Sequence, residues 1–106
     1  MTILHLALAD DWTAAVEAGE YRVSTLGRTL AQEGFIHACA DLEQLRAVAG
    51  RYYGQVSGPL VVLAIDEGRL DCPVVLEVPA GAGEAFPHIY GPLPVSAVIQ
   101  VTPFTR

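Results

Sequence analysis

The fold is decided by residues 34–41, which read Gly-Phe-Ile-His-Ala-Cys-Ala-Asp. The apolar part, residues 34–40, is typical of a β-strand entered through a glycine. Asp41 is a good N-cap for a helix predicted over residues 42–53, because its side chain can accept hydrogen bonds from the first helical turn. The apolar residues of this helix recur at helical spacing and are Leu42, Leu45, Val48, Ala49 and Tyr52. The segment therefore predicts a strand that leads directly into the clearest helix of the chain.

The part of the chain before this segment predicts a strand over residues 2–8, followed by a short helix. We expect Asp10 to cap that helix and Gly19 to end it. An extended stretch follows over residues 20–24. Residues 25–33 leave two alternatives open, because leucines at helical spacing are interrupted by a glycine.

The part after the segment is nearly all extended. Strands are predicted over residues 59–65, 74–78 and 95–102, with a loop over 79–87 and a short extended stretch over 88–91. Two helices in the N-terminal half followed by strands predict an α+β fold with mainly antiparallel pairing, rather than alternating βαβ units. A chain of 106 residues without an internal repeat predicts a single domain, residues 1–106.

Charge and composition exclude several classes of partner. The chain is 52% hydrophobic and 17% charged, which is typical of a compact globular protein, and its net charge is −6. Six basic residues without a run predict no nucleic-acid binding and no attraction to an anionic membrane surface. A small anionic ligand stays compatible with this charge, because one or two local donors suffice to bind it.

The N-terminal sequence and the two cysteines bear on the cellular location of the protein. The N-terminal apolar run has no basic leader and meets Asp10 and Asp11 at once, and no apolar run approaches the roughly 20 residues of a membrane span. Cys39 and Cys72 form no CxxC pair, and we expect no disulfide between them. The sequence therefore predicts a cytoplasmic protein, either a monomer or a small homo-oligomer.

Three histidines stand inside apolar runs, and they are all the histidines of the chain. His5, His37 and His88 each interrupt a predicted strand, where an imidazole must find a hydrogen-bond partner. Strand periodicity places His37 on one face with Phe35, and His88 on one face with Tyr90. Either the imidazoles converge on a common cleft, or each is a separate core histidine bonded to a backbone carbonyl.

Glu77 is the second anomaly, because it interrupts the apolar run of residues 74–78. A carboxylate there lies either on the solvated side of an edge strand or in a polar pocket. In a pocket, its charge could stabilise a developing cation. A metal centre built on the three histidines, with Glu77 or Cys39 as fourth ligand, is a weaker alternative, because no two histidines are close in sequence. We therefore expect no metal.

Four segments together resemble a known family. They are Leu4-His5-Leu6, Glu33-Gly34-Phe35-Ile36-His37, Glu77, and residues 86–94, which read Phe-Pro-His-Ile-Tyr-Gly-Pro-Leu-Pro. These segments resemble a small bacterial family known as domain of unknown function 952, and the resemblance extends from His5 to Val101. The chain departs from the family at residues 38–40, where a serine hydroxyl near His37 is commonly present.

That family in turn resembles a minimal ADP-ribosyltransferase fold with a split β-sheet core. The resemblance implies that His5 grips the ribose and nicotinamide half of NAD and that His37 packs beside the nicotinamide. It implies Glu77 as the third catalytic residue, with His88 as its rival. Phe35, His88 and Tyr90 are then expected to bind the ligand.

The resemblance implies a transferase-like domain that binds NAD or a related nucleotide and cleaves the bond between nicotinamide and ribose. NAD is the candidate substrate, and Arg22, Arg28 or Arg51 would meet its pyrophosphate. An RNA-directed phosphotransferase is disfavoured by the acidic charge. Two alternatives stay open: a noncatalytic module on the same scaffold that binds a small ligand or a protein, and a metal-dependent hydrolase built on the three histidines.

Overall fold

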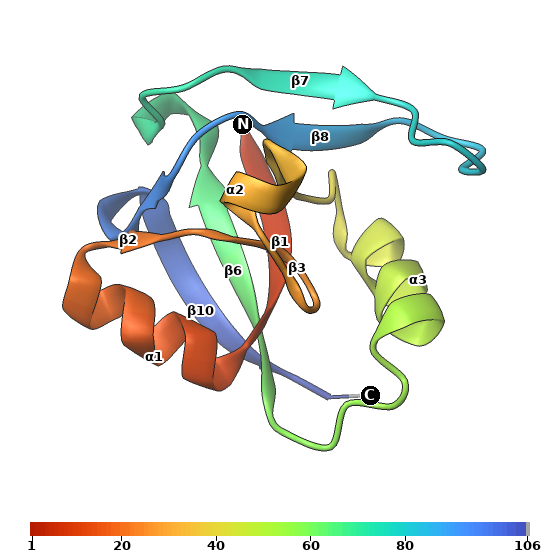
Figure 1. Ribbon diagram of the computed structural model, residues 1–106, viewed down its shortest axis with the longest axis horizontal. Helices are drawn as coiled ribbons and strands as arrows, with labels where there is room; N and C mark the ends of the chain where they lie inside the picture. The colour runs from red at the N-terminus through yellow and green to blue at the C-terminus, as the bar shows by residue number, and fades with distance from the viewer. Residues whose placement is uncertain (106) are drawn as a thin grey trace.

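Two three-stranded antiparallel sheets form the centre of the protein (Figure 1). The computed structural model describes residues 1–105. The first sheet has the order β1-β6-β10 and consists of Thr2–Leu8, Leu60–Asp66 and Val98–Phe104. The second has the order β5-β8-β7 and consists of Ile36–His37, Phe86–Ile89 and Val74–Glu77. All pairs are antiparallel, which confirms the α+β class predicted from the sequence.

Smaller elements surround these sheets. Two short antiparallel pairs are β2 with β9 (Glu20–Tyr21 and Leu93–Pro94) and β3 with β4 (Val23–Thr25 and Arg28–Thr29). The α-helices are α1 (Ala9–Ala18), α2 (Leu30–Glu33) and α3 (Leu42–Tyr52). Short 3-10 turns cover Glu67–Arg69 and Val95–Ala97. In Figure 1, β7 and β8 cross the top of the view, while α1 and α3 flank the first sheet below them.

The first sheet buries both faces of β1 and β6, which carry apolar residues on each side, whereas β10 at its edge is largely exposed. One core cluster joins Ile3 and Leu63 of that sheet to Ile36 and Ile89 of the second sheet. The other joins the opposite face to α3, whose buried face includes Leu45. This double burial fixes the register of β1, since a shift by one residue would exchange the two faces.

A single bridge connects the two sheets beside β1. Leu4 donates its N–H to the carbonyl of Cys39 at 2.8 Å, and Cys39 donates back to the carbonyl of Leu4 at 2.6 Å. The chain between β5 and α3 is therefore held against the free edge of β1. This contact places His5 and His37 close together, although they stand 32 positions apart in the chain.

The predicted helix ends hold where local capping decides them. Asp41 accepts from the N–H of Gln44 at 2.8 Å and caps α3, and Gly19 ends α1 with a φ of 90°. The prediction that Asp10 caps α1 is wrong, because the helix begins at Ala9 and Leu8 stands at the cap. Asp10 and Asp11 instead lie in the first turn, where their charge favours the helix dipole.

A third helix arises where the sequence left the structure open, so the prediction of two helices is wrong. The short helix α2 has a capping box, in which Thr29 accepts from Gln32 N–H and the Gln32 side chain accepts from Thr29 N–H. The reciprocal bonds stabilise a single helical turn that follows directly after β4.

Three strand boundaries differ from the sequence prediction. Only residues 36–37 of the predicted strand 34–40 join the second sheet. Phe86 and Pro87 belong to β8 rather than to the loop. The last strand covers residues 98–104 instead of 95–102, because a 3-10 turn occupies its predicted start. None of the helices in residues 1–105 is long and apolar enough to cross a membrane, and both cysteines are free thiols.

Candidate ligand-binding cavity

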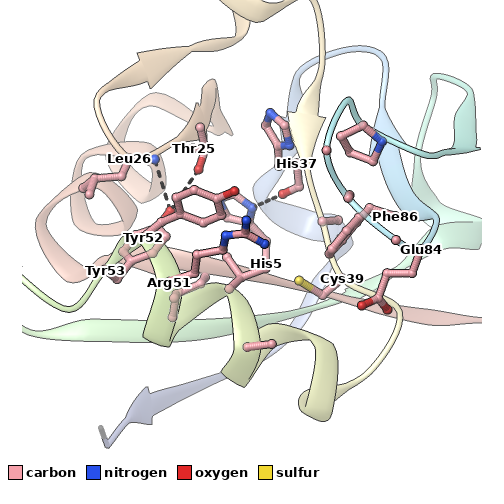
Figure 2. Close-up of a pocket in the computed structure, with 18 of the residues that line it drawn as sticks. His5, Thr25, Leu26, His37, Cys39, Arg51, Tyr52, Tyr53, Glu84 and Phe86 are labelled. Carbon is pink, nitrogen blue, oxygen red and sulfur yellow. Dashed lines mark hydrogen bonds between the residues drawn. The ribbon is translucent and has the colours of Figure 1, made fainter.

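A cavity of about 480 Å³ lies beside the edge of β1. This volume falls in the range of roughly 300–1,000 Å³ that is usual for small-molecule sites. Its walls come from β1, the turn between β3 and β4, residues 37–39, the C-terminal half of α3, and residues 79–84. In Figure 2, Arg51, Tyr52 and Tyr53 lie on one side of the cavity, and Cys39, Glu84 and Phe86 lie on the other.

Tyr53 fixes one wall of the cavity. Its ring is 3% exposed, and its hydroxyl accepts from the N–H of Leu26 at 3.1 Å and lies 3.3 Å from the Thr25 hydroxyl. Burial raises the pKa of Tyr53, so the hydroxyl stays protonated and able to donate. These bonds hold the β3–β4 turn against the end of α3.

Gln44 fixes the opposite wall. Its side-chain N–H group donates to the Glu84 carboxylate at 2.8 Å and to the carbonyl of Ala85 at 3.0 Å. Its side-chain oxygen accepts from Ala40 N–H at 2.7 Å. Gln44 thus ties residues 79–85, which are mostly glycine, alanine and proline, to the start of α3. Small side chains leave the cavity open beside this loop.

His5 is a buried histidine with both nitrogens occupied. Its Nδ1 lies 2.5 Å from the carbonyl of His37, and its Nε2 lies 2.9 Å from the Tyr21 hydroxyl. A carbonyl only accepts, so Nδ1 carries the proton and Nε2 accepts from Tyr21. Burial lowers the pKa of His5 to about 4. His5 is therefore neutral near pH 7 and offers no unpaired nitrogen to a ligand.

His37 is the more accessible imidazole of the cavity wall. Its side chain is 34% exposed, and its Nε2 lies 3.7 Å from a carboxylate oxygen of Glu33. Burial and the neighbouring His88 lower the pKa of His37, while Glu33 opposes the shift. Neutral His37 can therefore accept or donate a hydrogen bond at the cavity without first losing a strong partner.

Arg51 is the basic side chain of the cavity wall. Its guanidinium carbon lies 5.7 Å from the centre of the Tyr52 ring, and it has no ion pair within residues 1–105. Arg22 and Arg28, the other two candidates for a pyrophosphate, pair with Glu20 and Glu33. Of the three arginines, Arg51 alone has its charge available at the cavity.

Glu77 lies outside the cavity wall, in a second polar cluster on the β5–β8–β7 sheet. Its Oε1 accepts from Nδ1 of His88 at 2.8 Å and also from the Tyr90 hydroxyl. These two bonds lower the pKa of Glu77, the Tyr90 bond most strongly. The side chain is 40% exposed, so Glu77 combines both sequence interpretations: a half-solvated carboxylate that also has specific partners.

Phe35 and Tyr90 complete this second cluster. The Phe35 ring stacks on His88 with ring centres 4.0 Å apart, and it contacts His37 at 4.8 Å and Tyr90 at 5.3 Å. His37 and His88 are directly opposite each other in the β5–β8 pair. The two histidines thus share one face of the sheet with Phe35 and Tyr90, as strand periodicity predicted.

The three histidines therefore form two pairs that have His37 in common. His5 and His37 line the cavity, whereas His88 and Glu77 lie behind His37, away from the cavity lining. Convergence on one hollow holds for the first pair alone. Within residues 1–105, no group of three His, Cys, Asp or Glu side chains is arranged to hold a metal ion. Because both His5 nitrogens are occupied, the three histidines do not assemble a joint metal site.

The roles of Glu84, Tyr53 and Gln44 at the cavity were not predicted from the sequence. Glu84 is the one charged residue in the stretch 79–87, and that contrast could have marked it. Tyr53 and Gln44 carried no local sign of their roles, because their partners Leu26 and Glu84 stand 27 and 40 positions away.

Fold and cavity define an α+β protein with a small-molecule-sized site between a sheet edge and a helix. A model of the family described as protein of unknown function (DUF952) matches residues 6–101. The chain belongs to this family, as the sequence predicted.

Solved structures of one bacterial protein share the fold. A crystal structure of protein CC0527 from Caulobacter crescentus is 30% identical, with a TM-score of 0.79, and the match covers 99% of this chain and 87% of that one. The solution NMR structure of CC0527 is 29% identical, with a TM-score of 0.74, and the match covers 95% and 82% of the two chains. No curated protein matches the chain.

Proposed function

We propose that this protein binds NAD or a related nucleotide in the cavity and cleaves the bond between nicotinamide and ribose, as an ADP-ribosyltransferase-like domain. The observation that carries the proposal is that His5 and His37, from two different sheets, meet at one cavity whose wall also holds an unpaired arginine. The family resemblance to the transferase fold is an argument from architecture, and fold alone does not give function. The site residues therefore have to support each step.

Arg51 is the group that would bind the pyrophosphate. A guanidinium presents paired N–H donors that match phosphate oxygens, and such charge-assisted bonds are stronger than neutral ones. The acidic protein offers no broad basic surface, so a local cation has to supply the attraction. Apolar and aromatic groups of the wall, such as Phe86 and Val48, suit the flat rings of the nucleotide.

Glu84 replaces Glu77 as the candidate carboxylate. The bond to nicotinamide breaks through a transition state with positive charge on the ribose, and a nearby carboxylate stabilises that charge. Glu84 lines the cavity and is oriented by Gln44, whereas Glu77 does not line it. His5 acts as a positioning residue, because it holds the carbonyl of His37 and thereby the strand that carries the His37 ring.

A noncatalytic binding module is the second candidate. It is favoured by the saturation of His5, because a first-strand histidine with both nitrogens bonded to protein cannot donate to a ribose without losing a partner. Such a module would bind the nucleotide through Arg51 and the apolar wall and release it unchanged.

Titration with NAD, ADP-ribose and nicotinamide, followed by NMR of the histidine ring protons and by assay of free nicotinamide, tests the proposal. We expect Arg51→Gln to weaken binding of NAD and ADP-ribose about tenfold, equivalent to about 1.4 kcal/mol, and to leave nicotinamide binding unchanged. Arg46→Gln is the matched control, because Arg46 lies on the same helix and lines a different groove.

The catalytic part is tested by Glu84→Gln, with the exposed Glu43 of α3 as control. We expect Glu84→Gln to abolish release of nicotinamide while NAD still binds, and Glu43→Gln to behave as wild type. Binding without turnover in the unmodified protein would support the noncatalytic module instead. Absence of any ring-proton shift with all three compounds would refute nucleotide binding.

A further inference from the structure

Among the buried side-chain nitrogen and oxygen atoms of residues 1–105, one has no hydrogen-bond partner, and it is Nε2 of His88. The His88 side chain is 3% exposed. Leaving a buried acceptor unpaired costs about 1–3 kcal/mol, and native proteins rarely leave one so. The atom therefore indicates a partner that joins in another state of the protein.

The bond between Glu77 and His88 determines whether Nε2 carries a proton. Its carboxylate oxygen lies 2.8 Å from Nδ1 of His88 and can only accept, so Nδ1 carries the proton of the neutral ring. Nε2 then bears a lone pair. The Tyr90 hydroxyl donates to the same Glu77 oxygen and steadies it. His88 is thus held as an acceptor that lacks a donor.

His37 is the donor within reach. The ring centres of His37 and His88 are 5.1 Å apart, with the rings at 74° in an edge contact. His88 is held by Glu77 and by the stacked Phe35 ring, whereas the His37 side chain is 34% exposed and has Glu33, at 3.7 Å, as its one ionic partner in residues 1–105. Directing a ring nitrogen of His37 at His88 requires a rotation of the His37 side chain, and the 3.7 Å contact to Glu33 is too long to oppose it strongly.

We propose that His37 and His88 share a single proton in an N–H···N hydrogen bond, with Glu77 as the counter-charge, and that this pair is the base that takes the proton of the acceptor in the proposed reaction. The inference rests on the proposed function for its catalytic part. The acceptor is a protic nucleophile, either water or a hydroxyl group. Glu77 and His88 are positioning residues here, because they act on the reaction through His37.

With a hydroxyl acceptor, the bond between ribose and nicotinamide breaks, and its electron pair stays on the nicotinamide nitrogen. The acceptor oxygen forms the new bond to the ribose carbon, and its proton passes to His37 and is shared with His88. The positive charge of the pair is then balanced by Glu77, and the proton later returns to solvent at the exposed side of His37.

The charged surroundings favour one proton and oppose a second. Glu33 faces His37 from α2 and is itself paired with Arg28 of β4 through its other oxygen. Glu77 faces His88 from β7, and the buried His5 faces His37 from β1. Tyr90 approaches the pair only through Glu77. Glu77, with a smaller contribution from Glu33 because Arg28 already pairs with it, stabilises one positive charge on the pair. Two imidazolium rings in edge contact would repel each other, so the proposed pair holds one extra proton rather than two.

Nitrogen-15 NMR of the histidine rings over a pH series tests the shared proton in the free protein, without NAD. We expect the ring nitrogens of His37 and His88 to change at one common midpoint, and a scalar coupling to appear between a His37 nitrogen and Nε2 of His88. Two independent midpoints, or a proton on Nε2 of His88 in the neutral pair, would overturn the proposal.

Glu77→Gln and Tyr90→Phe form a matched pair of variants with opposite expectations. Glu77→Gln removes the counter-charge, and we expect the common midpoint to fall by about one pH unit. Tyr90→Phe removes a competing donor and keeps the charge, so the midpoint stays or rises. A common midpoint that is the same in Glu77→Gln as in the unmodified protein contradicts the proposal. If that variant does not fold, His88→Phe keeps a ring on Phe35, and the coupled signal has to vanish.

Activity separates this inference from the proposed function. If the pair is the base, the rate of nicotinamide release rises with pH through the common midpoint found by NMR, and the midpoint of the rate moves with it in Glu77→Gln. A pH profile that does not follow the NMR midpoint overturns the base role. If the unmodified protein does not bind the nucleotide, the proposed function and the base role are both refuted. The shared proton is tested independently, by the NMR experiment alone.

Discussion

His5 and His88 are equally buried, each 2% exposed, yet their surroundings differ in one respect. Both nitrogens of His5 have partners, Tyr21 on one side and the carbonyl of His37 on the other. His88 has one partner, Glu77, and one bare nitrogen. A buried histidine with partners on both ring nitrogens stabilises the fold. A buried histidine with one unpaired nitrogen can still accept a further hydrogen bond. The bonding state, rather than burial, therefore distinguishes the structural imidazole of His5 from that of His88, to which we assign a role in the proposed reaction.

The largest expected effect is on stability, from His5→Ala compared with His88→Ala. We expect His5→Ala to lower the free energy of unfolding by about 3–5 kcal/mol, because it leaves a void and unpairs the buried Tyr21 hydroxyl. We expect His88→Ala to cost about 1–2 kcal/mol less, because the half-exposed Glu77 can bond to water instead. Urea unfolding of the two variants measures the difference.

Tyr21→Phe sharpens the same comparison. It removes the hydroxyl that donates to Nε2 of His5 and keeps the ring in place, so it turns His5 into a histidine with one bare nitrogen. A loss of about 1–2 kcal/mol is expected. Equal losses for His5→Ala and His88→Ala, together with a silent Tyr21→Phe, would break the distinction between the two histidines.

The sequence predicted the local features of the molecule but not the contacts between distant segments. Local signals gave the Asp41 cap, the Gly19 helix end and the shared face of Phe35 and His37, because each depends on neighbours within a few residues. The pairing of His37 with His88 across β5 and β8 depends on register between segments 51 positions apart, which no local pattern specifies. The same holds for Glu84, which reaches the cavity only because Gln44 holds the loop.

Helix α2 was missed for a different reason. Thr29 and Gln32 have the spacing of a capping box, so the signal was present in the sequence. Gly27 obscured it, because that glycine adopts a φ of 72° in the turn before the helix and not within it. Gly27 belongs to the turn that precedes the helix, so it does not argue against a helix that begins after the capping Thr29. Its presence had left residues 25–33 open between a helical turn and an irregular segment.

The next prediction concerns the pH dependence of stability that the buried His5 contributes. The pKa of His5 falls from 6.5 to about 4 on folding. Between these pH values, the His5 imidazole binds a proton in the unfolded chain but not in the folded protein. Stability contributed by neutral His5 is therefore complete above pH 6.5 and is lost as the pH falls toward 4. The full loss is about 3 kcal/mol, from roughly 1.4 kcal/mol per pH unit.

Urea unfolding at closely spaced pH values between 4 and 7 measures this slope. His5→Gln is the control, because it retains a polar side chain and removes the titrating ring, and the slope assigned to His5 has to disappear with it. A slope that persists unchanged in His5→Gln would show that another group binds the protons, and the neutral state assigned to the saturated histidine would be wrong.

The smallest expected effect concerns the cavity wall rather than the global fold. Gln44→Ala removes the bonds to Glu84 and Ala85 that tie residues 79–85 to α3, and it also removes the acceptor of the Ala40 N–H. We expect a loss of about 1–2 kcal/mol in global stability, and faster hydrogen exchange confined to the amides of this loop and of Ala40. Hydrogen-exchange mass spectrometry or NMR measures the change.

Glu84→Gln separates the two roles of this contact, since an amide oxygen can still accept from Gln44 while the charge is lost. We expect its loop amides to exchange nearly as in wild type, in contrast to Gln44→Ala. If both variants loosen the loop equally, the carboxylate charge holds the wall and cannot also be free to stabilise a ligand. If only Gln44→Ala does, the hydrogen bonds position the loop, and the charge of Glu84 is left facing the cavity that His5 also lines.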